Sequence, residues 1–304
     1  MDDLPVLHTA YDRGYSDCIW RHPEPQTLFF IFPCDNIILI MKILLALTIC
    51  LVFIGAEIGF AEPLKEHSLG VSTEMSYIIY DEPSVMEEKG MMYGVGASYT
   101  YRKDYMFNVE ARYSYGQVDY KNSGTIDNID DFVLEFRGLV GYDFSRYEGY
   151  GITPYVGIGY RYLNDDSSGM TSSTGARGYE RESNYFYSPI GIELINPLNN
   201  NWSMGMILEY DYFWKGVQKS HISDAVSGFN DLENDQNEGY GLRASLRFEK
   251  KGREVDFLIE PFVRYWNIEQ SETENITYSG ALWGYGWEPE NNSTEIGIRL
   301  SAIL

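Results

Sequence analysis

Hydrophobic and polar residues alternate in segments of about a dozen residues from His67 to the end of the chain. In residues 202–215, for example, Trp, Met, Leu and Tyr alternate with Ser, Gly, Glu and Asp. This period of two is typical of a β-strand, because successive side chains point to opposite faces. The pattern predicts ten strands, at 67–80, 91–102, 105–119, 131–144, 152–163, 184–195, 202–215, 238–249, 255–267 and 293–304.

The connections between these segments alternate in length. The short ones are 103–104, 145–151, 196–201 and 250–254, and the longer ones are 81–90, 120–130, 164–183, 216–237 and 268–292. Short turns at one end and long loops at the other are typical of barrels of the bacterial outer membrane. We therefore expect an all-β fold, an antiparallel transmembrane β-barrel with an up-and-down meander of about ten strands, over residues 62–304.

The two faces of the strands differ in a way that favours a membrane barrel over a soluble β-sandwich. The apolar face ends in tyrosine and tryptophan, such as Tyr99 and Tyr105 at one end and Tyr210 and Trp214 at the other. These rings suit a membrane interface, since each has an apolar body and a polar tip. The other face mixes Gly and Ser with charged residues. We expect the apolar face to contact lipid and the polar face to line the lumen.

The N-terminal region carries a processing signal. Met41-Lys42 precedes an apolar run, Ile43–Ile54, and the small residues of Gly59-Phe60-Ala61 follow. This order predicts a signal peptide at 41–61 and a mature chain from Glu62. The alternative, a membrane-anchoring helix, would have to bury Lys42 and Glu57. Residues 1–40 contain six acidic and two basic residues, so we interpret them as a start-site artefact or a disordered extension.

Composition narrows the class of protein further. The net charge of −22 argues against nucleic acid as a partner, because phosphate binding needs a basic surface. A mean hydropathy of −0.30 argues against a helical membrane protein. Cys18, Cys34 and Cys50 all precede the barrel segment, which is therefore free of thiols. A chain that crosses an oxidising periplasm benefits from this arrangement. We expect the bacterial outer membrane as the location.

The architecture of residues 62–304 resembles the small outer-membrane barrels of the OmpA and Opa types. The last segment, Glu295–Leu304, is similar to the C-terminal signal that the barrel assembly machinery reads, although this chain ends in Leu304 where such proteins usually end in Phe or Trp. The resemblance implies outer-membrane lipid and lipopolysaccharide as surroundings and the barrel assembly machinery as a partner. It implies no nucleic acid, and the surface partner stays unknown.

The face assigned to the lumen carries nearly equal numbers of Glu and Arg, seven and eight. Buried charges must be paired, and the planar guanidinium of Arg matches a carboxylate. We expect a lumen charge network formed by Glu74, Glu110, Arg112, Glu135, Arg137, Arg161, Glu209, Arg243, Glu260, Arg264, Glu295 and Arg299. Such a network would plug a narrow barrel. This favours a structural or surface-interaction role over the alternative, a small passive channel.

Two hairpins specify their own register. If Arg112 faces Glu135, antiparallel pairing also places Glu110 opposite Arg137, and a Ser123-Gly124 turn follows. In the last hairpin, Glu260 opposite Arg299 likewise places Arg264 opposite Glu295. Opposite charges directly across a ladder favour this register over a slip. We expect these four pairs on adjacent strands, inside the barrel.

A hydrolase at the outer rim is a further alternative. Ten strands resemble the omptin proteases, which use Asp pairs and an Asp–His pair there, and His221 with Asp224, or Asp127, Asp130 and Asp131, are the residues to compare. The spacing of His221 and Asp224 departs from the omptin arrangement, and no Ser-His-carboxylate set stands out. We expect no catalytic residues, no cofactor and no metal. The aromatic residues of the last loop, Tyr278, Trp283, Tyr285 and Trp287, form a candidate interaction patch.

Overall fold

The computed structural model describes residues 65–144, 151–198 and 200–304. The expected signal peptide and the segment before it lie outside the described residues. Ten long strands form the barrel: β1 (His67–Glu82), β2 (Met86–Arg102), β3 (Tyr105–Asn122), β4 (Gly124–Tyr142), β5 (Gly151–Asp166), β6 (Glu180–Pro197), β7 (Trp202–Ser220), β9 (Gly239–Lys250), β10 (Asp256–Ile268) and β13 (Asn291–Ile303).

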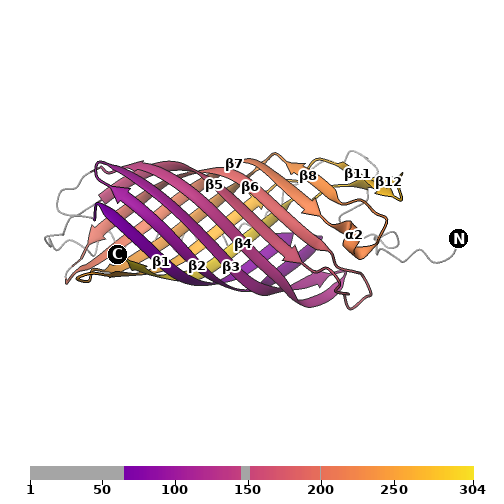
Figure 1. Cartoon of the computed structure of the whole chain (residues 1–304), viewed down its shortest axis with the longest axis horizontal. Helices are drawn as coiled ribbons and strands as arrows, with labels where there is room; N and C mark the ends of the chain where they lie inside the picture. The colour runs from indigo at the N-terminus through magenta and orange to yellow at the C-terminus, as the bar shows by residue number, and fades with distance from the viewer. Residues whose placement is uncertain (1–64, 145–150, 199) are drawn as a thin grey trace.

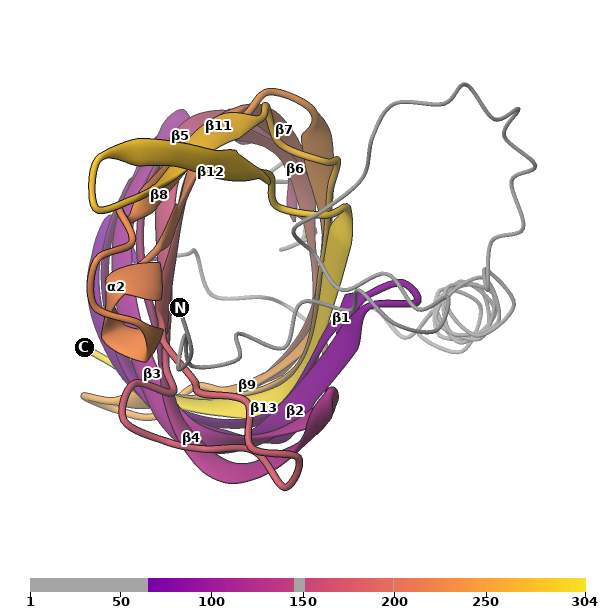
Figure 2. The same cartoon turned by 90° about the vertical axis from the view of Figure 1, so that its right-hand side faces the viewer.

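Each barrel strand pairs antiparallel with its neighbours in the chain, and β13 pairs with β1. The ladder from Gly70–Ile303 to Asp81–Asn292 closes the ring, which Figure 2 shows end-on. The predicted fold class, an up-and-down antiparallel barrel of about ten strands, is confirmed. Across the described ranges, no helix is long and apolar enough to cross a membrane.

The outward surface of the barrel is apolar. Large exposed side chains cover it, among them Val95, Val109, Phe136, Ile158 and Ile190. The inward side chains at alternating positions include most of the buried charged residues. This distribution is the reverse of that of a soluble protein and suits a barrel whose exterior contacts lipid.

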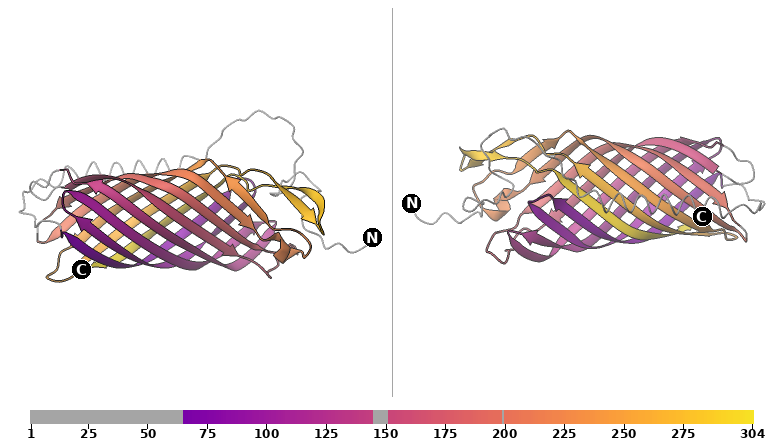
Figure 3. Two further views of the ribbon diagram at one scale, coloured as in Figure 1. Left: turned by 45° about the horizontal axis from the view of Figure 1, so that its top comes forward. Right: turned by 180° about the vertical axis from the view of Figure 1, so that it is seen from behind.

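The two ends of the barrel differ. The C-terminus and the final residues of β2, β4, β6 and β9 lie at one end (Figure 1, left), which is the periplasmic end by the rule of short turns. The other end carries α2 (Ile222–Ala225), β8 (Leu232–Gln236), β11 (Glu274–Tyr278) and β12 (Ala281–Gly286). Here β8 pairs with the outer end of β7, and β11 and β12 form a separate hairpin (Figure 3).

Two of the predicted outer loops are wrong. Residues 81–90 and 120–130 belong almost entirely to β1, β2, β3 and β4, which are joined by residues 83–85 and by Ser123. The strands continue past the point where the hydrophobic alternation ends, so pairing persists beyond it. Opposite charges support it, since Lys121 faces Glu87 and Lys89 faces Asp119. The acidic residues of the 81–90 segment, Asp81, Glu82, Glu87 and Glu88, therefore lie in strands.

The predicted Ser123-Gly124 turn is also wrong by one residue. The β3–β4 register is the predicted one up to Val118–Ile129, and then shifts so that Tyr120 faces Ile126. The extra residue forms a bulge at Asp127 and Asn128, where Asn128 has a φ of 60° and its N–H donates to the Asp119 side chain (3.0 Å). An inserted bulge residue changes the register beyond it, and nothing in the alternation marks its position.

The interior is divided into layers along the barrel axis. In the outer half, two apolar clusters fill the lumen: Ile78, Met92, Val118, Ile129, Val133 and Leu163 form one, and Tyr185, Tyr187, Phe213, Trp266 and Ile268 form the other. Charged residues occupy the middle. The periplasmic half contains a cavity of about 360 Å³, bordered on one wall by small residues of β1 and β2.

Candidate functional site in the lumen

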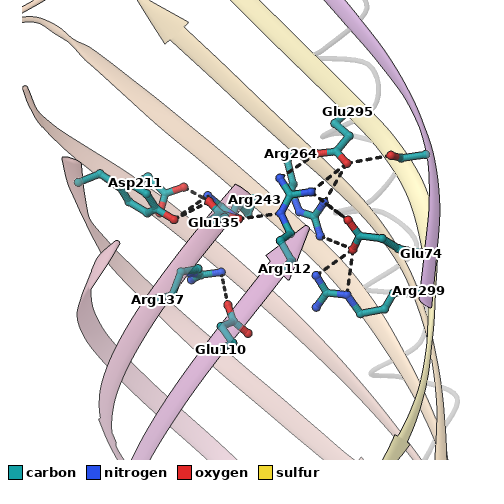
Figure 4. Close-up of polar contacts among 12 residues, drawn as sticks. Glu74, Glu110, Arg112, Glu135, Arg137, Asp211, Arg243, Arg264, Glu295 and Arg299 are labelled. Carbon is teal, nitrogen blue, oxygen red and sulfur yellow. Dashed lines mark hydrogen bonds and ion pairs between the residues drawn. The ribbon is translucent and has the colours of Figure 1, made fainter. Parts of the chain in front are cut away.

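Arg112 is the centre of the charged layer (Figure 4). Its guanidinium lies 2.8 Å from Glu135, 2.9 Å from Glu74 and 3.2 Å from Glu295. Arg264 reaches Glu295 at 3.0 Å and Glu74 at 3.1 Å. All five side chains are buried. The two guanidinium groups and three carboxylates therefore come from five strands, and each carboxylate has more than one donor.

A second group extends the layer across the lumen. Arg243 donates to Asp211 at 2.6 Å and to Glu135 at 2.5 Å, so Glu135 joins the two groups. The Tyr187 hydroxyl also donates to Glu135 (2.6 Å). Glu209 accepts a hydrogen bond from Tyr155 (2.7 Å) and an ion pair from Arg137. The charged layer is therefore a continuous set of paired charges that spans the barrel.

The four reciprocal pairs have the predicted register. Glu110 faces Arg137 and Arg112 faces Glu135 on β3 and β4, while Glu260 faces Arg299 and Arg264 faces Glu295 on β10 and β13. The facing side chains form ion pairs of 2.9, 2.8, 3.8 and 3.0 Å, respectively. All eight side chains point inward, since each lines the cavity of the periplasmic half or belongs to the charged layer.

Arg161 departs from the expected network. It lies directly opposite Glu135 in the β4–β5 ladder and is only 3% exposed. Its guanidinium nevertheless lies over the rings of Tyr185 (5.7 Å) and Trp266 (5.8 Å). Glu135 is already saturated by Arg112, Arg243 and Tyr187, which explains why Arg161 packs against aromatic faces instead. The prediction that Arg161 pairs within the network is wrong.

Glycine positions make room for these long side chains. A Cβ atom at Gly94 would lie 2.7 Å from Cγ of Glu74, its partner across the β1–β2 ladder. A Cβ atom at Gly159 would lie 2.2 Å from the ring of Tyr187. The glycines of these strands therefore allow the charged layer and the aromatic cluster to fill the lumen at close range.

Several lumen residues were not predicted. Asp211 is fully buried, and its alternation with Glu209 along β7 was the signal that could have found it. Nearer the outer mouth lies a second buried charged group: Glu82, Glu88, Asp131, Asp165, Arg181 and Glu288. Most of these residues belong to segments that the alternation assigned to loops, so an inward direction could not be expected for them.

The aromatic patch of the last loop is split by the structure. Trp283 and Tyr285 lie on β12 and are exposed, as is the neighbouring Leu282. Tyr278 at the end of β11 is half-buried against Phe229, with ring centroids 5.1 Å apart. Trp287 is half-buried and follows β12 on the way back to the barrel mouth. The exposed part of the patch is therefore the β12 strand alone.

The structure does not bring together the residues compared with omptins. His221 lies at the start of α2, and its ring nitrogens approach Glu182 (2.8 Å) and Asp231 (3.5 Å), not the Asp224 carboxylate. Partial burial lowers the pKa of His221, but the two carboxylates outweigh it and raise that pKa above the usual value. Asp131 points into the lumen, whereas Asp130 binds Tyr115 on the outer surface (2.6 Å).

Several solved structures of outer-membrane proteins are similar to this chain. The outer membrane protease OmpT from Escherichia coli is 7% identical, with a TM-score of 0.51, over 82% of this chain and 100% of that one. The translocator domain of the autotransporter NalP from Neisseria meningitidis is 10% identical, with a TM-score of 0.41, over 79% and 90%. The beta domain of the Bordetella autotransporter BrkA is 11% identical, with a TM-score of 0.36, over 76% and 98%. At these identities the likeness concerns the fold alone.

A search among curated proteins gave no significant match. The family comparison is more specific, because residues 52–249 match the profile described as the autotransporter beta-domain. This span covers most of the chain and includes β1 to β7 and nearly all of β9. It matches that family, not the OmpA- or Opa-type barrels that the architecture resembles. With its closed barrel and lipid-facing exterior, this chain belongs to the autotransporter beta-domain family and is a protein of the bacterial outer membrane.

Proposed function

We propose that this protein is a closed outer-membrane barrel that serves a structural or surface-interaction role through its outer loops. One observation carries the proposal: the charged layer and the two apolar clusters together occupy the lumen from its middle to its outer end. A solute pathway would favour charges of one sign and a continuous space. Here the charges are paired.

The outer end offers a surface for such a role. The hairpin of β11 and β12 stands above the barrel rim, and Leu282, Trp283 and Tyr285 are exposed on it. Exposed aromatic residues are common in binding surfaces, because they bury large areas at low entropic cost. In this proposal, outer-membrane lipid and lipopolysaccharide surround the barrel, the assembly machinery inserts it, and its role is similar to that of the OmpA- and Opa-type barrels.

Single-channel recording in planar bilayers tests the proposal. We expect no stable conductance steps from the purified protein. A variant with Tyr187→Ala and Trp266→Ala, which thins the outer aromatic cluster, should conduct and thus shows that the assay detects an opened lumen. A variant with Tyr212→Ala and Trp214→Ala removes comparable rings from the exposed outward face and should behave like the wild type. Regular conductance steps from the wild type would contradict the closed barrel.

A small passive channel is the second candidate, and the cavity in the periplasmic half favours it. If the outer clusters move aside, this cavity would become the inner vestibule of a pore. The same recordings separate the two proposals, because a gated channel would open in brief steps under voltage whereas a plugged barrel would stay silent.

We further propose that the protein has no enzymatic activity. A catalytic histidine needs one ring nitrogen free to take a proton from substrate or water, while a carboxylate orients the other. In this structure carboxylates approach both ring nitrogens of His221. Incubation with a peptide library is the test: cleavage that His221→Ala abolishes would support the rim hydrolase instead.

A further inference from the structure

The segment that follows β12 leads back to β13 at the outer end of the barrel. Glu288 lies in this segment and is only 6% exposed, although the neighbouring Glu290 is exposed. Its backbone N–H donates to the Ser271 hydroxyl (2.7 Å), and the Ser271 N–H donates to the Glu288 carbonyl (3.0 Å). These two bonds join the start and the end of the last outer loop, so the side chain of Glu288 is held over the barrel.

The carboxyl group of Glu288 meets an excess of negative charge. The charged and titratable groups of this site come from five strands. They are Tyr80 and Glu82 on β1, Glu88 on β2, Asp131 on β4, Asp165 on β5 with the more distant Arg161, and Arg181 and Tyr185 on β6. Arg181 is already used, since it binds Glu82 at 2.9 Å and Glu88 at 2.8 Å and lies 3.8 Å from Asp165.

The hydrogen bonds of Tyr80 indicate where a proton resides. The Tyr80 oxygen lies 3.2 Å from Glu82 and 3.1 Å from Glu288, and its single hydrogen serves only one of these contacts. The other contact is a hydrogen bond only if a carboxyl group donates to the tyrosine. Glu82 is the charged partner, because it binds the guanidinium of Arg181.

We propose that Glu288 is held as a neutral carboxylic acid that locks the last outer loop over the mouth of the barrel, and that loss of its proton releases this lock. The proposal does not depend on the closed-barrel function. The Glu288 carboxyl group is then a pH-sensitive contact at the end of the barrel that faces the external medium.

The electrostatics of the site agree with this assignment. Burial, with a further contribution from the Glu82 carboxylate, raises the pKa of Glu288 to about 8 against the opposing effect of Arg181. A carboxyl group with a raised pKa holds more protons in the locked state than in the released one. Its contribution to the lock is complete below the ordinary value of 4.5, declines as pH rises, and is lost once pH passes about 8.

Trp287 provides the measurement, because it precedes Glu288 and is half-buried. Its emission is obtained as the difference between the full protein and a Trp287→Phe form, and its quenching by acrylamide is followed from pH 6 to pH 9. We expect quenching to rise several-fold with increasing pH and to level off above about pH 8. Glu288→Gln keeps a neutral hydrogen-bonding group and should leave Trp287 protected at every pH. Glu290→Gln removes the same charge two residues away and should behave like the wild type.

A second variant acts on the lock without changing Glu288. Glu82→Gln removes a negative charge that raises the pKa of Glu288, so it should move the midpoint of the rise downward by about one pH unit. The proposal is wrong if wild-type quenching does not change with pH, if Glu288→Gln responds as the wild type does, or if Glu82→Gln leaves the midpoint where it was.

Discussion

At the scale of single residues, Arg112 is the position where the lumen is most sensitive. It binds Glu74, Glu135 and Glu295, so Arg112→Gln would leave three buried carboxylates with fewer donors. Removing one partner of a buried ion pair costs about 3–5 kcal/mol, because the remaining charge stays in a poorly solvated place. Urea unfolding of the barrel in lipid vesicles measures this loss.

The matched control for this substitution is Arg253→Gln. Arg253 is exposed in the turn before β10, so its replacement should change stability by less than about 0.5 kcal/mol. Equal effects of the two substitutions would show that the layer contributes nothing beyond surface charge.

The sequence predicted the inward direction of side chains that lie in strands with a clear alternation of polar and apolar residues. Glu110, Arg137, Glu260 and Arg299 lie in well-marked strands, and their reciprocal charges determined the register. Glu288 was beyond prediction, because its buried position depends on the path of a long loop. Arg161 shows a different limit of prediction from sequence. The alternation along its strand gives the direction of the side chain, but its partner depends on which groups already bind Glu135.

At the scale of the elements, the bulge in β4 can be tested by its backbone geometry. Asn128 adopts a φ of 60°. Glycine occupies this left-handed region without steric strain, whereas a β-branched residue is strained there. Asn128→Val should destabilise the barrel by about 1–2 kcal/mol, whereas Asn128→Gly should be nearly neutral. Both values come from the same unfolding assay. A neutral Asn128→Val would mean that the bulge is absent in solution.

The strands were predicted in number and order, and their outer ends were not. Alternation indicates contact with two different environments, and along the sequence it ends near Met91 in β2 and Asp119 in β3. Hydrogen bonding continues beyond these positions through Glu87, Lys89 and Lys121. The sequence predicts a loop where β11 and β12 form a hairpin, because glycines interrupt the short aromatic run of this segment.

At the scale of the whole molecule, closure of the ring predicts a characteristic behaviour in detergent. Every barrel strand has two partners, so no edge offers a place for unfolding to begin. We expect the protein to stay folded in sodium dodecyl sulfate at room temperature and to migrate differently on a gel after boiling. Identical migration of the heated and unheated samples would contradict a closed barrel.

The layered interior divides the titratable groups of one protein between two aqueous compartments. The cavity borders Arg247, Arg299 and Glu110, so this part of the charged layer experiences the ionic strength and acidity of the periplasm. The carboxyl groups at the mouth lie on the far side of the apolar clusters and experience the external medium instead. The groups at the mouth and those beside the cavity are therefore in contact with different compartments, and a titration at the mouth is separated from the periplasmic side by the apolar clusters.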